Sequence, residues 1–181
     1  MTRIGINGFG RIGRLALRAG WDRGDLQFVH VNEPNGGPDA AAHLLTFDSV
    51  HGRWERGARG DGATLTIDGV ELVFSEAMAP GRGRLDGGRR RGGARVLRQV
   101  PNRRGVGGAY FERGVQKVIA APVKNPGALN VVVGVNDDRY DPAVHDIVTA
   151  APCTTNCLAP VVQVLHEGLG SCGDRSPRCM I

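Results

Sequence analysis

The sequence predicts an α/β protein built on a mostly parallel sheet with helices on both faces. Short runs rich in Val and Ile alternate along the chain with segments whose apolar residues recur at helical spacing. Gly, Pro and Asn separate these segments, as is usual where strands and helices of such a sheet are joined. A chain of 181 residues is long enough for one domain and the beginning of another.

The predicted elements follow from these two periodicities. Strands are expected at residues 3–6, 26–31, 63–67, 70–74, 116–120, 130–133 and 146–149. Helices are expected at residues 10–22, 38–45 and 153–168. Asp68-Gly69 stands between two alternating segments and is typical of a β-hairpin turn. The last helix is predicted to be amphipathic, with one apolar face formed by Leu158, Val161, Val162 and Leu165.

The net charge of +5 is concentrated in one segment. Residues 82–108 contain nine Arg and one Asp, a net of +8, so the rest of the chain carries −3. The segment has too few apolar residues to pack, although a further strand and helix should complete the sheet there, and we expect it to be disordered. Arg/Gly-rich segments also bind RNA, but this one lacks aromatic residues for stacking, so nucleic acid is an unfavoured partner.

The remaining totals indicate a cytoplasmic protein that does not enter a membrane. No apolar run reaches the roughly 18 residues that a membrane-spanning helix needs, and the N-terminus lacks the apolar stretch of a signal peptide. The four cysteines all lie in the last 29 residues, which is a poor arrangement for a disulfide framework. We expect them to be reduced.

A glycine motif joins the first predicted strand to the first helix. Gly8, Gly10 and Gly13 fit the pattern G-x-G-x-x-G in the strand–turn–helix context of a dinucleotide-binding site. Gly8 allows the tight turn, Gly10 lets a pyrophosphate approach, and Gly13 permits close packing of helix on strand. Glu33, 20 residues after Gly13, can bind ribose hydroxyls and repel a 2′-phosphate. The motif predicts NAD in preference to NADP; a chance match and an exposed turn acid are the alternatives.

Cys153 is the candidate nucleophile. It begins the last predicted helix, where the helix dipole favours the thiolate. A capping or buried cysteine is the plainer alternative. A zinc site formed with Cys157 is a weaker one, because only Cys172 and Cys179 remain to complete it, and we expect no metal.

Several motifs together resemble the phosphorylating, NAD-dependent glyceraldehyde-3-phosphate dehydrogenases. In chain order they are IGINGFGRIGR, FDSVHGRW, KVIAAPVKNP, VVVGVNDDRYD and CTTNCLAP. The resemblance covers residues 1–81 and 110–170. It implies an incomplete Rossmann-type NAD-binding domain at 1–150, followed at 151–181 by the first helix of a truncated α+β catalytic domain. The family is homotetrameric, and much of its subunit interface would lie outside this chain.

The resemblance also implies roles for individual residues. The pyrophosphate would be held by Gly8, Gly10, Arg11 and Ile12, with Asn32 and Glu33 at the adenosine ribose. Glu33 stands where the family usually has Asp. The Cys153 thiolate would attack the aldehyde of glyceraldehyde 3-phosphate and become a thioester, which inorganic phosphate, bound in part by Thr154, would cleave to an acyl phosphate.

The chain also departs from the family pattern. Pro152 replaces a Ser that is expected to bind phosphate, and the histidine expected to take the thiol proton, in a T-x-H motif, is not found before Ile181. We therefore expect weak activity or none from this chain. A non-catalytic NAD-binding fragment and an erythrose-4-phosphate dehydrogenase remain alternatives, and an arsenate-linked role stays open. Abrupt changes of composition at 82–108 and 171–181 suggest that both segments arise from shifts of reading frame.

Overall fold

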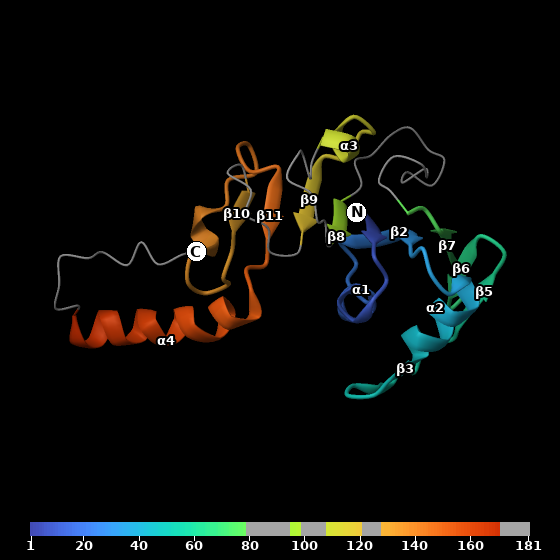
Figure 1. The fold of residues 1–181 in the computed structure, drawn as a ribbon, viewed down its shortest axis with the longest axis horizontal. Helices are drawn as coiled ribbons and strands as arrows, with labels where there is room; N and C mark the ends of the chain where they lie inside the picture. The colour runs from blue at the N-terminus through green and yellow to red at the C-terminus, as the bar shows by residue number, and fades with distance from the viewer. Residues whose placement is uncertain (79–94, 99–107, 121–127, 171–181) are drawn as a thin grey trace. The chain divides into compact units, whose positions relative to one another are not determined.

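A computed structural model describes residues 1–78, 95–98, 108–120 and 128–170 (Figure 1). The chain forms two compact units, Met1–Val118 and Ile119–Ile181. This division falls earlier in the chain than the predicted boundary between residues 150 and 151. The predicted α/β class is confirmed.

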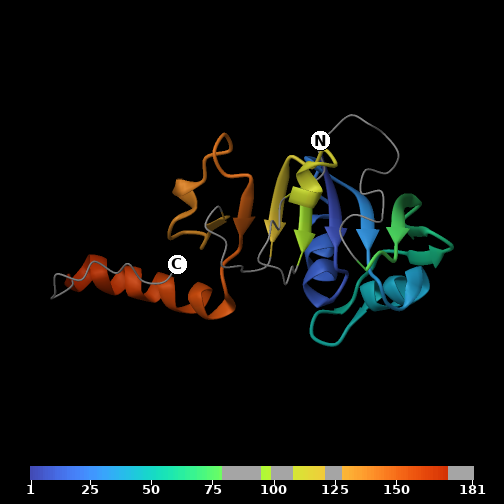
Figure 2. The same cartoon turned by 45° about the horizontal axis from the view of Figure 1, so that its top comes forward.

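The first unit is built on a twisted sheet with α1 and α2 packed against it (Figure 2). Its strands are β1 (Thr2–Asn7), β2 (Leu26–Asn32), β5 (Ala58–Asp61), β6 (Thr64–Ile67), β7 (Val70–Ser75) and β8 (Arg95–Arg98), with β9 (Lys117–Ala120) crossing the boundary. Its helices are α1 (Arg11–Gly20), α2 (Gly37–Thr46) and the short α3 (Gly108–Phe111). A separate small hairpin consists of β3 (Phe47–Asp48) and β4 (Gly52–Arg53).

The order of neighbouring strands confirms the predicted parallel arrangement at the centre of this sheet. The order runs β8-β1-β2-β7-β6-β5. The pairs β8–β1, β1–β2 and β2–β7 are parallel, whereas β7–β6 and β6–β5 are antiparallel. The predicted hairpin about Asp68-Gly69 is the β6–β7 pair. The carboxyl ends of β1, β2 and β7 therefore meet at one edge of the sheet.

A core of aliphatic and aromatic side chains holds α1 and α2 on the sheet. Its buried members are Ile6, Phe9, Leu17, Phe28, Val31, Ala41, Ala42, Leu45, Leu65, Ile67, Leu72 and Phe74. Trp21 extends this core, stacking on Phe28 with ring centroids 6.2 Å apart and meeting Trp54 edge-on at 6.1 Å. Trp21, Phe28 and Trp54 thus form an aromatic group where α1 ends, and aliphatic side chains make up most of the rest of the core.

The prediction that residues 82–108 are disordered is wrong at residues 95–98. These residues form β8, which pairs in parallel with β1 through Ile4–Arg95, Gly5–Val96 and Ile6–Leu97. The apolar pair Val96-Leu97 favours a strand, and the ladder uses backbone groups whatever the flanking side chains are. Gly108 begins α3. The rest of the segment lies outside the described residues, as does 171–181.

The second unit contains a short parallel pair and one long helix. The pair is β10 (Ala128–Asn130) with β11 (Ile147–Thr149), and the helix is α4 (Cys153–Leu169). The predicted strand at 130–133 ends at Asn130, because the amide of Asn136 takes over the backbone there: Val132 N donates to Asn136 Oδ1 at 2.7 Å. Asp137–Arg139 then form a single 3-10 turn.

Helix α4 is present as predicted, but its apolar face is not packed. Leu158, Val161 and Leu165 are all exposed, and α4 has no buried residue within the part of the chain that the structure describes. Among the helices of the described ranges, none combines the length and apolar character needed to cross a membrane.

Candidate functional site

The glycine turn between β1 and α1 has the geometry that the sequence motif predicts. Gly8 has φ +100°, a conformation that L side chains rarely adopt, and its N–H donates to Asn32 O at 2.8 Å. At Gly13 a Cβ would lie 2.3 Å from Gly8 O, so only glycine fits where α1 crosses the turn. At Gly10 a Cβ would meet nothing within 4 Å, which leaves space for a close approach.

The first turn of α1 is suited to an anion. No acidic residue lies in this turn, and Gly10 provides no side-chain hydrogen bond to cap it. The first N–H groups of a helix lack partners within the helix and carry partial positive charge, so they attract phosphate oxygens. Ile12 also lies in this turn, with 80% of its surface exposed.

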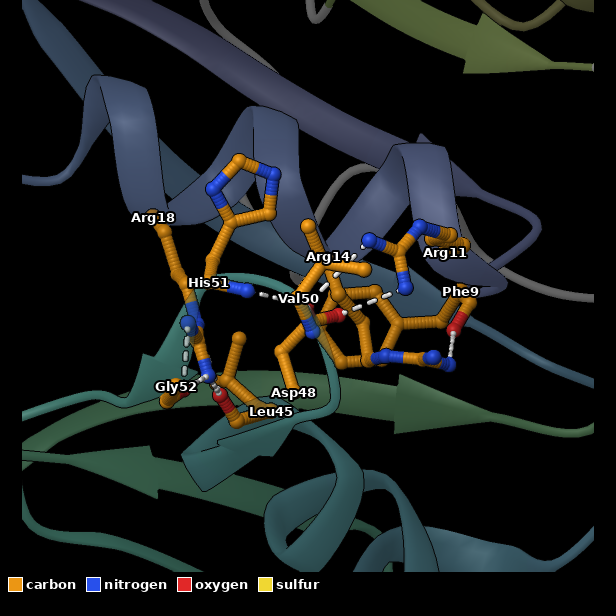
Figure 3. A network of polar contacts seen from close by, with 9 residues as sticks. All are labelled: Phe9, Arg11, Arg14, Arg18, Leu45, Asp48, Val50, His51 and Gly52. Atoms are coloured by element: carbon orange, nitrogen blue, oxygen red, sulfur yellow. Dashed lines mark hydrogen bonds and ion pairs between the residues drawn. The ribbon is translucent and has the colours of Figure 1, made fainter.

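Arg11 is bound to a neighbouring loop instead of standing free for a pyrophosphate. Its guanidinium forms an ion pair with Asp48, with contacts of 3.1 and 3.2 Å (Figure 3). The Asp48 carboxylate also accepts hydrogen bonds from Val50 N at 2.9 Å and His51 N at 2.8 Å. Arg11 therefore fastens the 48–51 turn to the start of α1, a pairing that no motif in the sequence predicts.

Arg18 makes a second link between α1 and the same loop. Its Nε donates to Leu45 O at 2.8 Å, at the end of α2, and Nη1 donates to Gly52 O at 3.2 Å (Figure 3). Arg14 contributes at the other end, where Nη1 donates to Phe9 O at 2.9 Å. Arginines spaced along one face of α1 thus hold the glycine turn, the end of α2 and the β3–β4 hairpin together.

We predict that Asp48 contributes to folding stability only while its carboxylate is ionised, so Asp48→Asn should remove this pH-dependent contribution. Backbone hydrogen bonds from His51 and Val50, followed by the nearby charge of Arg11, lower the pKa of Asp48 from 3.8 to about 2. The ionised carboxylate therefore stabilises the fold above the unfolded-state pKa, and this contribution disappears as the pH falls through about 2. Thermal unfolding should show Asp48→Asn less stable near neutral pH, with the difference from the unaltered chain closing between pH 4 and 2. A difference independent of pH would contradict this assignment.

Glu33 lies beside the glycine turn, as the motif predicts. Its Oε2 accepts a hydrogen bond from Phe9 N at 2.8 Å, and its own N–H donates to Ser75 O at 2.9 Å. The carboxylate thereby links the turn after β1 to the turn after β2. This places a negative charge at the carboxyl edge of the sheet, next to the glycines.

Asn32 is the last residue of β2 and its side chain holds neighbouring strand ends together. Its side chain is buried, and its amide is fully bonded within the protein. Nδ2 donates to Asn7 Oδ1 at 2.8 Å and Ala77 O at 3.0 Å, while Oδ1 accepts from Ser75 Oγ at 2.7 Å and Ala77 N at 2.8 Å. Asn32 thereby joins the ends of β1, β2 and β7, and its place at a ribose stays a prediction.

Sequence reasoning missed the rest of this buried network. Asn7 donates from Nδ2 to the hydroxyl of the buried Tyr110, and Ser75 Oγ lies 2.9 Å from His30 Nε2. The network therefore runs across β1, β2 and β7 and reaches α3. A usable signal was present, because a buried strand that ends in Asn places an amide at the carboxyl edge, and both β1 and β2 end in this way.

In the second unit, Cys153 begins α4 as predicted. Cys153 and Cys157 are both exposed free thiols, and Thr154 is exposed beside them. Pro152 occupies the cap position in extended backbone and provides no side-chain hydrogen bond to the helix. The first turn of α4 contains no acidic residue. Within the described ranges, no three His, Cys, Asp or Glu residues are grouped as metal ligands.

Two histidines are described in this unit, His166 on α4 and His145 in the turn that begins at Asp141. His166 lies on α4 itself, 13 residues after Cys153, and a rise of about 1.5 Å per residue separates the two by about 20 Å along the helix. His145 Nδ1 accepts a hydrogen bond from Asp141 N at 3.0 Å in its own turn. His166 is therefore too far along its own helix to act as a general base for Cys153.

A glycine turn that opens a helix at the carboxyl edge of a parallel sheet, with an acid ending the next strand, defines a dinucleotide-binding α/β domain. Comparison with known proteins agrees. Residues 2–83 match the family described as the NAD binding domain of glyceraldehyde 3-phosphate dehydrogenase. The chain is therefore related to the glyceraldehyde-3-phosphate dehydrogenases, as its motifs indicated, and the domain that it matches is described as binding NAD.

Individual relatives cover nearly the whole chain. It is 55% identical over 173 residues to glyceraldehyde-3-phosphate dehydrogenase 3 of Nostoc sp.. It is 40% identical over 176 residues to the glyceraldehyde-3-phosphate dehydrogenase of Geobacillus stearothermophilus, and 36% identical over 172 residues to enzyme 1 of Bacillus subtilis. Each match covers 93% of this chain and 50% of the relative, so the chain spans about half the length of the relatives it matches.

Proposed function

We propose that the first unit binds NAD and that the second provides the nucleophile of a phosphorylating aldehyde dehydrogenase. The observation that carries the proposal is the glycine turn, where Gly13 leaves no room for a side chain while Gly10 leaves space for a ligand. Backbone N–H groups of the first turn of α1, near Gly8, Gly10 and Ile12, would hold the pyrophosphate. Glu33 would bind the ribose hydroxyls, with Asn32 supporting it from below.

Arg11 would act near the same phosphates without leaving Asp48. The ion pair neutralises part of its charge and holds the side chain, so Arg11 would tune the field around the pyrophosphate more than it would bind a phosphate oxygen directly. Ile12 would contact an apolar face of the ligand through its exposed side chain.

The chemistry we propose for Cys153 is covalent. Its thiolate would attack the aldehyde carbon of glyceraldehyde 3-phosphate, and oxidation of this adduct would leave a thioester on the sulfur. Bound NAD supplies the hydride acceptor that the oxidation needs. Inorganic phosphate, held in part by Thr154, would then displace the thiol and form an acyl phosphate. Cys153 contributes the nucleophile and the helix terminus stabilises its anion.

Calorimetric titration of the 181-residue chain with NAD tests the proposed cofactor site. We expect binding with a preference for NAD over NADP, because Glu33 would repel a 2′-phosphate. Gly10→Val should weaken NAD binding at least about tenfold, since its side chain would fill the space over the turn. Gly24→Ala, another position where a Cβ meets nothing within 4 Å, is the matched control and should bind as the unaltered chain does. Equal binding by the Gly10 and Gly24 variants would disprove the pyrophosphate assignment.

Narrower proposals rest on the sequence and on the relatives' names. We infer a cytoplasmic protein, as one relative from Scenedesmus vacuolatus is described as cytosolic, and a homotetramer as the assembled form. A non-catalytic NAD-binding fragment or an erythrose-4-phosphate dehydrogenase would share the same first unit. Reading-frame shifts as the origin of 82–108 and 171–181 are tested by the gene: its neighbouring frames should encode strand-like and family-like sequence there.

A further inference from the structure

The turn that presents Cys153 has an unusual backbone. Ala151 has φ +52°, in the left-handed region that favours glycine, although it is a buried residue with a Cβ. The next residue is Pro152, and a residue before proline normally prefers extended backbone. Two local preferences therefore oppose this conformation. A strained turn persists only where its surroundings impose it, so neighbouring contacts must hold the chain in this form.

The side chain of Asn156 supplies such contacts from the first turn of α4. Its Nδ2 donates to Ala150 O at 2.7 Å and Pro152 O at 3.0 Å, with a longer contact to Ala151 O at 3.4 Å. One amide thus engages the carbonyls of the consecutive residues that lead into Cys153. Backbone Asn156 N also donates to Pro152 O at 3.0 Å. The turn is therefore bound to α4 by both the backbone and the side chain of Asn156.

A second set of bonds holds the other side of the turn. Ala151 N donates to Thr149 Oγ1 at 3.3 Å, and the buried Thr149 donates in turn to Asn130 Oδ1. Asn136 Nδ2 donates to Asn130 O at 3.0 Å, which fixes Asn130 itself. A chain of polar contacts therefore runs from the 130–136 turn through the end of β11 to Ala151.

We propose that Asn156 is a positioning residue for Cys153, holding the strained Ala151-Pro152 turn so that the thiol stays at the helix terminus. The inference deepens the proposed function and rests on the assignment of Cys153 as nucleophile. Without the amide, Ala151 relaxes toward extended backbone and the first turn of α4 frays. The thiol then loses the fixed N–H groups and the dipole that favour its anion.

Competitive alkylation tests this on the 181-residue chain, with Cys157 as an internal control on the same helix. Iodoacetamide is added near neutral pH, and mass spectrometry follows the labelling of both thiols. We expect Cys153 to react faster than Cys157 in the unaltered chain. Asn156→Ala should lower the rate at Cys153 about fivefold, as loss of one neutral hydrogen-bonding group implies, while the rate at Cys157 changes little. A loss of general structure would move both rates together.

A second variant separates positioning from simple strain. Ala151→Gly removes the conformational strain but leaves Asn156 in place, so Cys153 should keep its fast rate. The double variant Ala151→Gly, Asn156→Ala has a flexible glycine and lacks the amide that holds the turn. Of all the variants it should show the slowest alkylation of Cys153. If Asn156→Ala leaves the ratio of the two rates unchanged while Cys153 is fast in the unaltered chain, the positioning role is wrong. If the two thiols react equally in the unaltered chain, the proposed nucleophile fails, and the inference fails with it.

Discussion

Gly13→Ala is expected to abolish NAD binding and to unfold the first unit at a much lower temperature. The added Cβ would lie 2.3 Å from Gly8 O and 3.1 Å from Ile6 Cγ2. The first contact is with backbone, so α1 must move away from the turn. Overpacking of this kind costs about 3 kcal/mol, which corresponds to a fall of roughly 10 °C in Tm. Calorimetry of unfolding and of NAD binding measures both effects.

Gly10→Ala is the matched control for this experiment. A Cβ at Gly10 meets nothing within 4 Å, so the variant should unfold at the temperature of the unaltered chain. A methyl group at the ligand's approach should still weaken NAD binding modestly. Normal stability together with normal NAD affinity in Gly13→Ala would show that α1 does not cross the turn as closely as the structure describes.

Gly60→Ala is expected to destabilise the first unit by a similar amount while leaving its NAD affinity nearly intact. Gly60 lies in β5 under the first turn of α2, where a Cβ would be 2.1 Å from Pro38 C and 2.3 Å from Asp39 N. Both contacts are with backbone, so α2 must lift from the sheet, at a cost of about 3 kcal/mol. The glycine turn is on β1, on the other side of β2, β7 and β6 in the strand order.

Comparison with Gly24→Ala isolates the effect of packing at Gly60. A Cβ at Gly24 would meet nothing within 4 Å, so Gly24→Ala should unfold at the same temperature as the unaltered chain. NAD affinity should be measured well below the unfolding transition, where both variants are folded. A Gly60→Ala chain with unchanged Tm would contradict the seating of α2 on β5, and a large loss of NAD affinity would contradict the independence of the two regions.

The parts of this fold that the sequence predicts are those determined by local patterns. Periodicity and turn residues predict a helix at 10–22 and strands at 26–31 and 70–74, and the structure has these elements with ends shifted by a few residues. The glycine turn was predictable because backbone conformation and close packing require glycine at fixed positions. The predicted strand at 130–133 ends early because the Asn136 side chain accepts a hydrogen bond from the backbone of Val132. The periodicity of apolar residues cannot predict a side-chain hydrogen bond of this kind.

The places of the glycine turn and of Cys153 at the starts of α1 and α4 were predictable from the sequence, but the polar contacts around them were not. Arg11 pairs with Asp48 across 37 residues, and Asn7 meets Tyr110 across 103 residues. Partners at such separations depend on the packing of α1 and α3 on the sheet, which no local pattern encodes. The strand at 95–98 was missed for a related reason: composition described the whole segment, whereas pairing with β1 depends on a few residues.

The bond between Asn7 and Tyr110, together with β8, has a consequence for the effect of substitutions. The residues on either side of 79–94 and 99–107 are attached separately to the sheet, through β7, β8 and α3. The end of β7, residues 95–98 of β8 and Tyr110 of α3 are thus each held by contacts of their own, so a substitution that weakens one of these attachments should leave the others in place.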